Sequence, residues 1–295
     1  YDPTHNYLFT LSLALPLARR RGVPLVLYNM SLGPVKTPAG ERLLARILRA
    51  ADLVVTRDAD SHDLARRLGP FEDKLRLGAD CALNVVPSDD ARLAELARRT
   101  GILSGGRPAI GFNINRYLDT DVTPPGRKGI DRGAFVRAAA AVVDRAIDSF
   151  GVDVLLVVTQ PMDLEITEEL RRSLARPERA AIISNRDLSH NDIAKILSRL
   201  EMLIALRTHC LILATAMGTP VGCVVSYPKN RGYMRSIDMG DQILEFDGFS
   251  ERRLWELTER TWVRRDELRA RLVPAIAREK ARARESAELL APFLA

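Results

Sequence analysis

The stretch IALRTHCLILATAMGTPVGCVVSYPKN, residues 204–230, holds the pattern that decides the fold. An apolar run ends at Arg207 and His209, a helix-like segment follows, and Gly-Thr-Pro leads into a second apolar run rich in valine. Short apolar runs are typical of strands buried on both faces, and a helix between two of them predicts parallel pairing. The two basic residues therefore stand where a buried strand ends and a helix begins.

The same alternation continues on either side of this stretch and predicts two Rossmann-like α/β domains. We place the first domain at residues 1–104 and the second, with C-terminal helices, at 105–295, because a polar helix and Ser-Gly-Gly-Arg-Pro separate them. The first domain opens on a helix, so we expect it to lack its first strand or two.

The expected strands are 23–31, 52–58 and 74–83 in the first domain, and 108–115, 152–161, 180–184, 202–207 and 221–226 in the second. The expected helices are 7–20, 37–51, 60–69, 133–150, 163–175, 189–200 and 209–217. We expect Ser189 to be an N-cap, and the tail from residue 250 predicts one or two Arg-rich helices broken near Pro274.

Composition limits the classes of function. The chain has 295 residues, of which 46% are hydrophobic and 28% charged, as in globular proteins with sizeable cores. A net charge of +6 suits acidic substrates, nucleic acid or an anionic membrane surface. The basic residues alternate with acids and no nucleic-acid-binding pattern is present, so we expect no nucleic acid partner. No apolar run is long enough to cross a bilayer, and we expect at most peripheral membrane contact.

Cysteine and histidine usage also carries information. Cys81, Cys210 and Cys223 are odd in number, lack CxxC spacing and lie in apolar runs, so we expect buried free thiols. A reducing cytoplasm fits this pattern. None of the four histidines has a partner at metal-ligand spacing, and we expect no metal.

Several polar residues follow the expected strands of the second domain. At the carboxyl edge of a parallel sheet, helix N-termini offer N–H donors and partial positive charge to anions. Arg207 and His209 lie at such a junction, and Lys229 follows the next strand, a set that suits phosphate or carboxylate. An arginine paired with an acid and a histidine capping a helix remain the alternative.

The strand in GFNINRYL, residues 111–118, adds further candidates for substrate binding. Arg116 ends this strand, and Asn113 and Asn115 alternate along it, with plain strand-end polar groups as the alternative. Asp163 follows the next strand, where we interpret it as a helix cap, with orientation of a sugar as the alternative. Residues 117–133 are rich in Gly, Pro and charge and predict a long loop at the same edge.

A family resemblance joins these observations. The segment SRLEMLIALRTHCLILATAMGTPVGCVVSYPKN, residues 198–230, resembles the C-terminal signature of the polysaccharide pyruvyltransferase family, which has Arg-Leu-His, a small-residue helix, Gly-x-Pro and Tyr-x-Pro-Lys. The segments GVPLVLYNMSLGP, ADLVVTRDADS and GADCAL are similar to earlier family patterns, so the likeness spans about residues 15–235. Thr208 departs from the usual leucine.

The resemblance implies a GT-B-like α/β fold with two Rossmann-like domains facing a cleft and a C-terminal helical tail. It implies phosphoenolpyruvate as donor substrate, no other cofactor, and a saccharide acceptor, free or lipid-linked, that becomes a pyruvate ketal. Arg207 would bind the donor, and His209 would protonate either the leaving phosphate or the enol carbon. Arg116, Lys229, Asn113, Asn115 and Tyr227 would contact substrates. The oligomeric state and the acceptor sugar are left open.

Two other functions compete with this one. A GT-B nucleotide-sugar glycosyltransferase uses a similar strand, helix N-terminus and Gly-x-Pro turn, although the glutamate usual in that helix has no clear counterpart in CLILATAMGTP. A non-catalytic carbohydrate-binding relative would keep the fold without the reaction.

Overall fold

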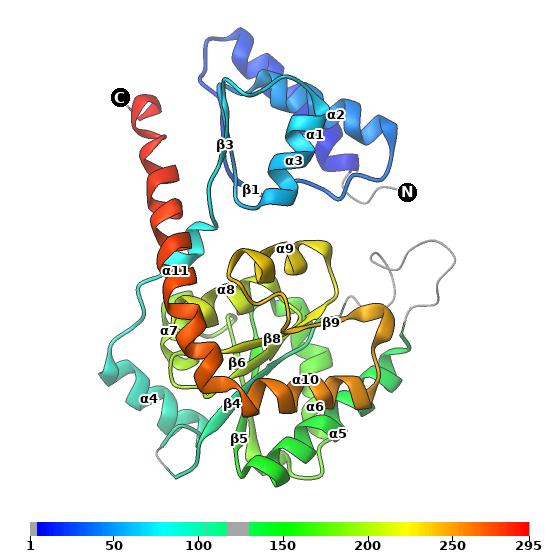
Figure 1. Cartoon of the computed structure of the whole chain (residues 1–295), viewed down its shortest axis with the longest axis vertical. Helices are drawn as coiled ribbons and strands as arrows, with labels where there is room; N and C mark the ends of the chain where they lie inside the picture. Colours follow the sequence, from blue (N-terminus) through cyan, green and yellow to red (C-terminus); the bar gives the residue numbers. More distant parts are fainter. Residues whose placement is uncertain (1–4, 105, 117–129, 295) are drawn as a thin grey trace. The chain divides into compact units, whose positions relative to one another are not determined.

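The computed structural model of the chain describes residues 5–104, 106–116 and 130–294 (Figure 1). The chain divides into two compact units, one made of residues 1–81 and 278–295 and the other of residues 82–277. Each unit holds a parallel β-sheet with helices, which confirms the predicted α/β class.

The first unit is built on three parallel strands in the order β1-β2-β3. Its elements are α1 (His5–Arg20), β1 (Val26–Met30), α2 (Pro38–Ala50), β2 (Leu53–Thr56), α3 (Ala59–Leu68), β3 (Leu75–Leu77), the end of α11 (Arg265–Glu288) and a 3₁₀ turn (Ala291–Phe293). Helix α2 starts where predicted because Thr37 accepts a hydrogen bond from the Gly40 amide and Pro38 occupies the first turn. The strand expected at 74–83 is shorter, because the chain leaves the sheet after Leu77 and forms a 3₁₀ turn at Cys81–Asn84.

The second unit contains six parallel strands in the order β6-β5-β4-β7-β8-β9. Its strands are β4 (Ala109–Asn113), β5 (Asp153–Val158), β6 (Ala180–Ser184), β7 (Leu203–Ala205), β8 (Val221–Val225) and β9 (Ile243–Glu245). Its helices are α4 (Asp90–Thr100), α5 (Arg132–Phe150), α6 (Leu164–Arg172), α7 (His190–Leu197), α8 (Thr208–Ala216), α9 (Pro228–Ser236), α10 (Glu251–Val263) and the first part of α11, with short 3₁₀ turns at Pro161–Asp163, Pro177–Arg179 and Phe246–Gly248. Counted within this unit, the strand order is 3-2-1-4-5-6, that of a dinucleotide-binding Rossmann fold.

Helices cover both faces of this sheet, which explains why its strands read as continuous apolar runs. Helices α5, α6 and α10 lie on one face and α7 and α8 on the other (Figure 1). Strands β4, β5 and β8 are buried along their whole length. Phe150 of α5 lies between Trp255 and Trp262 of α10, with ring centroids 5.4 and 4.6 Å away, so α10 belongs to the same core.

Three differences from the predictions concern the end of the chain and the boundary. Helix α9 and strand β9 were not predicted, because both are short and neither has a clear apolar period. The predicted break near Pro274 was wrong, because α11 continues through this residue. Proline has no N–H to donate to the carbonyl of Ala270, but both residues lie on the exposed side of the helix. The division into units also differs from the predicted boundary at 104, because α4 packs on α7 and β6.

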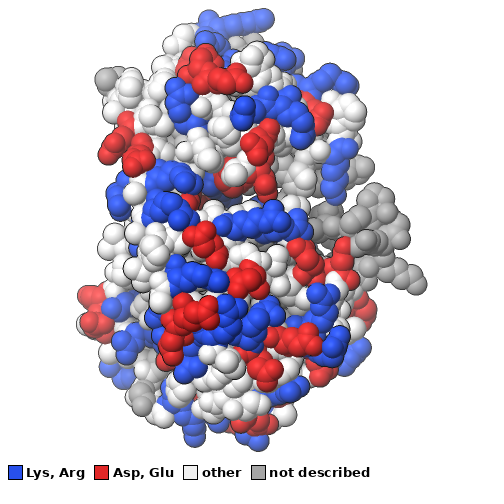
Figure 2. Space-filling model, viewed as in Figure 1, with Lys and Arg blue, Asp and Glu red and all other residues white. Residues whose placement is uncertain are grey.

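The surface mixes charges of both signs, as the sequence predicted. Figure 2 shows acidic and basic side chains interleaved over the face in view. Asp241, for example, forms ion pairs with Arg264 and Arg271. Among the described residues, no helix has the length and apolar character that crossing a bilayer would need.

Candidate functional site

The predicted site residues of the second unit gather where its strand order reverses. The chain runs outward in one direction from β4 through β5 to β6, and in the other direction from β7 to β9. In open α/β sheets, ligands bind outside the carboxyl ends of the strands at such a switch point. Arg116 follows β4, Arg207 follows β7, and Ser226 follows β8, so all three lie at this edge.

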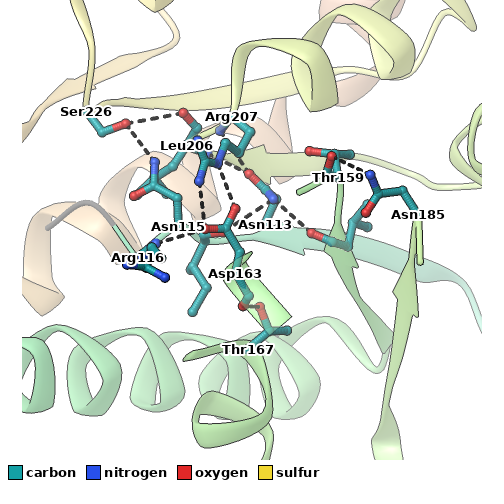
Figure 3. Close-up of polar contacts among 12 residues, drawn as sticks. Asn113, Asn115, Arg116, Thr159, Asp163, Thr167, Asn185, Leu206, Arg207 and Ser226 are labelled. Atoms are coloured by element: carbon teal, nitrogen blue, oxygen red, sulfur yellow. Dashed lines mark hydrogen bonds and ion pairs between the residues drawn. The ribbon is translucent and has the colours of Figure 1, made fainter. Parts of the chain in front are cut away.

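A buried ion pair stands at the centre of this edge. Arg207 donates from Nε to Oδ2 of Asp163 and from Nη2 to Oδ1, each at 2.7 Å. The Asp163 side chain is fully buried and that of Arg207 is 18% exposed. Oδ1 also accepts the Arg116 amide at 3.1 Å (Figure 3). Asp163 therefore fixes Arg207 rather than capping α6, and the capping interpretation was wrong.

This pair changes the electrostatics expected of Arg207. Two of the five N–H groups of a guanidinium are used by the carboxylate, and the carboxylate offsets its charge. The structure thus contains the arginine–acid pair that the sequence analysis gave as the alternative, and its acid is Asp163. The pair also orients the guanidinium at the end of β7.

Asn113 connects three strand ends. Its Oδ1 accepts the Leu206 amide at 3.2 Å and the Arg207 amide at 2.9 Å, and its Nδ2 donates to the Val157 carbonyl at 2.8 Å. Both sides of the amide are used within the protein. This arrangement favours a structural role for Asn113, which holds the backbone of Arg207 in place.

Asn115 differs from Asn113 although both lie on the same segment. It is 3% exposed, and its Nδ2 donates to Ser226 Oγ at 3.1 Å. Its Oδ1 is buried and accepts no hydrogen bond from any described residue. A buried acceptor without a donor costs about 1–3 kcal/mol, which is a reason to look for a ligand.

The other candidates lie on the two strand-to-helix junctions after β7 and β8. His209 is exposed in the first turn of α8, and Lys229 is half-buried in the first turn of α9. The Lys229 ammonium lies 5.2 Å from the centroid of the Tyr227 ring, a cation–π contact. Both helices point their N-termini, with partial positive charge, toward this edge.

A second buried polar network joins these two helices. Thr208 donates to Oδ1 of Asn230, and Asn230 Nδ2 donates to the Leu206 carbonyl at 2.6 Å. Ser226 Oγ lies 3.3 Å from the same carbonyl (Figure 3). Neither Ser226 nor Asn230 was predicted from the sequence, although both are polar residues that closely follow a buried strand.

Other candidates fall outside this group. Of the loop expected at 117–133, residues 117–129 lie outside the described part of the chain. Cys210 and Cys223 are buried, and burial raises the pKa of both thiols, which therefore stay protonated near neutral pH. Cys81 is exposed, so its predicted burial was wrong. The described residues contain no group of three or more His, Cys, Asp or Glu side chains arranged to hold a metal ion.

Comparison with solved structures defines the class of fold. The chain is similar to Anabaena Alr3699/HepE in complex with UDP and glucose, with 16% identity, a TM-score of 0.60, and coverage of 99% of this chain and 76% of that chain. It is also similar to UDP-GlcNAc 2-epimerase from Neisseria meningitidis bound to UDP-GlcNAc, with 12% identity, a TM-score of 0.62, and coverage of 99% and 74%. These likenesses confirm the predicted GT-B-like α/β class.

The family follows from the sequence itself. The model of the polysaccharide pyruvyl transferase family matches residues 1–227. The chain therefore belongs to the polysaccharide pyruvyl transferase family, as the motifs around Arg207 predicted.

Proposed function

We propose that this protein transfers the pyruvyl group of phosphoenolpyruvate to two hydroxyl groups of a saccharide and forms a pyruvate ketal. The observation that carries the proposal is the set of basic residues where the strand order of the sheet reverses, in a chain that belongs to this family. Arg207, His209 and Lys229 occupy the ends of β7 and β8 and the first turns of α8 and α9. A substrate that bears both a phosphate and a carboxylate needs several such groups close together.

The reaction balances without an oxidant or reductant. Two saccharide oxygens form bonds to C2 of phosphoenolpyruvate, the bond between C2 and the phosphate oxygen breaks, and inorganic phosphate leaves. One hydroxyl proton ends on C3, which becomes a methyl group, and the other ends on phosphate. A proton donor and a positively charged environment for the phosphate are therefore what the protein must supply.

The geometry supports a division of roles among the basic residues. Because Asp163 offsets the charge of Arg207, we assign the phosphate chiefly to Lys229, to Arg116 and to the N-termini of α8 and α9. Arg207, held rigidly by its bidentate pair, orients the donor carboxylate or phosphate. His209, exposed at the first turn of α8, transfers a proton either to phosphate or to C3.

Phosphate release from phosphoenolpyruvate in the presence of saccharides tests the proposal. We expect His209→Ala to lower turnover at least 100-fold, the size of effect typical of a general acid or base. Arg252→Ala is the matched control, because Arg252 is a strongly exposed basic residue of α10 in the same unit. If His209→Ala and Lys229→Ala, shown to be folded by circular dichroism, both turn over like wild type, the assignment is wrong.

A nucleotide-sugar glycosyltransferase is the second candidate, because structurally similar proteins were solved with UDP, UDP-glucose or UDP-GlcNAc. Thermal-shift measurements with phosphoenolpyruvate, UDP-sugars and GDP-sugars separate the two functions. A ligand present at 100 times its Kd stabilises the folded state by about 2.7 kcal/mol, so the true donor should raise the melting temperature clearly. Stabilisation by a nucleotide sugar alone would favour the glycosyltransferase.

A further inference from the structure

Asn115 is built differently from a structural asparagine. Two residues earlier on the same segment, Asn113 uses both its carbonyl oxygen and its amide nitrogen within the protein. Asn115 uses only Nδ2, which donates to Ser226 Oγ. Its Oδ1, although buried, receives no donor among the described residues.

The hydrogen bond to Ser226 fixes which way the amide faces. Ser226 Oγ approaches the Leu206 carbonyl, to which it donates, so its lone pairs are turned to the Asn115 nitrogen. Figure 3 shows the Asn115 oxygen on the side of the amide away from Ser226. The amide therefore keeps a buried acceptor oxygen without a donor among the described residues, next to Arg116 and at the carboxyl edge that carries Arg207.

The chemistry of an unused acceptor selects between the two substrates of the proposed reaction. Phosphoenolpyruvate near neutral pH carries phosphate and carboxylate oxygens, which are all acceptors and would repel Oδ1. A saccharide offers hydroxyl groups, each with an O–H donor. The carbonyl oxygen thus suits the acceptor substrate and disfavours the donor substrate.

We infer that Oδ1 of Asn115 accepts a hydrogen bond from a hydroxyl group of the saccharide acceptor and so sets acceptor specificity at the end of β4. This inference rests on the proposed function, which requires a saccharide at this edge. Asn115 positions the hydroxyl beside the basic residues, while Ser226 positions Asn115. Removal of the acceptor oxygen should weaken saccharide binding and leave phosphoenolpyruvate binding intact.

Isothermal calorimetry of the full chain with two kinds of ligand tests this. Methyl hexopyranosides are titrated into wild type and Asn115→Leu, and phosphoenolpyruvate is titrated separately into the same proteins. For Asn115→Leu we expect the Kd of the best glycoside to rise about tenfold or more, equivalent to about 1.4 kcal/mol. The Kd of phosphoenolpyruvate should change by less than about twofold.

Monodeoxy forms of that glycoside identify the hydroxyl. The analogue that lacks the recognised group should bind wild type about tenfold more weakly than its parent, and should bind Asn115→Leu as well as the parent does. Asn185→Leu is the matched control, because Asn185 is an exposed asparagine after β6 at the same sheet edge. We expect both ligands to bind this variant like wild type.

The outcomes separate the inference from the proposed function. Loss of glycoside binding in Asn115→Leu without any phosphate release by wild type would keep the saccharide subsite and reject pyruvyl transfer. Pyruvyl transfer with unchanged glycoside affinity in Asn115→Leu would reject the subsite and keep the transfer. If Asn115→Leu weakens the binding of the glycoside and of phosphoenolpyruvate equally, or if wild type binds no glycoside, the inference is also overturned.

Discussion

The ion pair between Asp163 and Arg207 gives the sharpest prediction about stability. In Asp163→Asn, one carboxylate oxygen becomes an NH₂ group. The carboxylate accepts three N–H groups, two from the Arg207 guanidinium and one from the Arg116 backbone. An amide keeps one acceptor oxygen, so at least one of these donors must face another donor. The guanidinium also loses the charge that offsets its own.

The magnitude follows from the burial of the two partners. Removal of one member of a buried pair costs about 3–5 kcal/mol, because the other charge stays behind without compensation. Arg207 keeps 18% of its side chain exposed, and water can solvate it in part. We therefore expect a loss near the lower limit, about 3 kcal/mol, or roughly a hundredfold in the folding equilibrium.

Urea unfolding followed by tryptophan fluorescence measures this loss. The two tryptophans of the chain, Trp255 and Trp262, both lie on α10 in the second unit, so their emission follows the unit that contains Asp163. Glu165→Gln is the control, because Glu165 is 76% exposed in its ion pair with Arg132 and its loss should cost less than about 1 kcal/mol.

A double-mutant cycle separates the pair from other effects of the substitution. Asp163→Asn combined with Arg207→Gln removes both charges, so the loss should be smaller than the sum of the single losses by more than about 1 kcal/mol. If Asp163→Asn unfolds at the same urea concentration as Glu165→Gln, or if the two single losses simply add, the buried pair does not stabilise this unit.

Three further predictions concern the same unit. Although burial acts to raise it, hydrogen bonds from an arginine and two serines lower the pKa of Asp192 from 3.8 to about 2. The ionised Asp192 therefore stabilises the folded state fully above its pKa in the unfolded chain, and this stabilisation is lost as the pH falls toward 2. In Asp192→Asn, the free energy of unfolding measured by fluorescence should depend less on pH in this acid range. Gly222→Ala would place Cβ 2.6 Å from Ile204 Cδ1 and should cost about 1–3 kcal/mol in urea unfolding. Thr208→Val removes the donor to buried Asn230 and should cost about 1–3 kcal/mol in the same assay.

The sequence predicted most of the buried strands of the second unit because their signals are local. Apolar runs bounded by Gly, Pro and polar residues mark β4, β5 and β8, and each is buried throughout as expected. Ser189 was predicted as an N-cap, and it forms a capping box with Asp192. The parallel order of strands then brings the residues that follow them to one edge, and this placed Arg207 and Arg116 correctly.

Contacts between residues far apart in the chain were not predictable in this way. Asp163 binds Arg207 across 44 positions, and no periodicity relates the two. The two asparagines of the β4 segment look equivalent in sequence, yet one is fully hydrogen-bonded and the other keeps a buried acceptor. The difference arises from which neighbouring strand end each side chain meets, and that depends on the assembled sheet.

Thr208, which departs from the usual leucine of the family motif, now has a physical explanation. Its side chain is buried and donates to Asn230, so the hydroxyl is satisfied inside the protein. Thr208 is adjacent in sequence to His209 on α8, and Asn230 is adjacent to Lys229 on α9. His209 and Lys229 are both candidates for binding the donor substrate. The hydrogen bond therefore holds the first turns of these helices together. A leucine at position 208 could not donate this hydrogen bond, so threonine adds a link between α8 and α9.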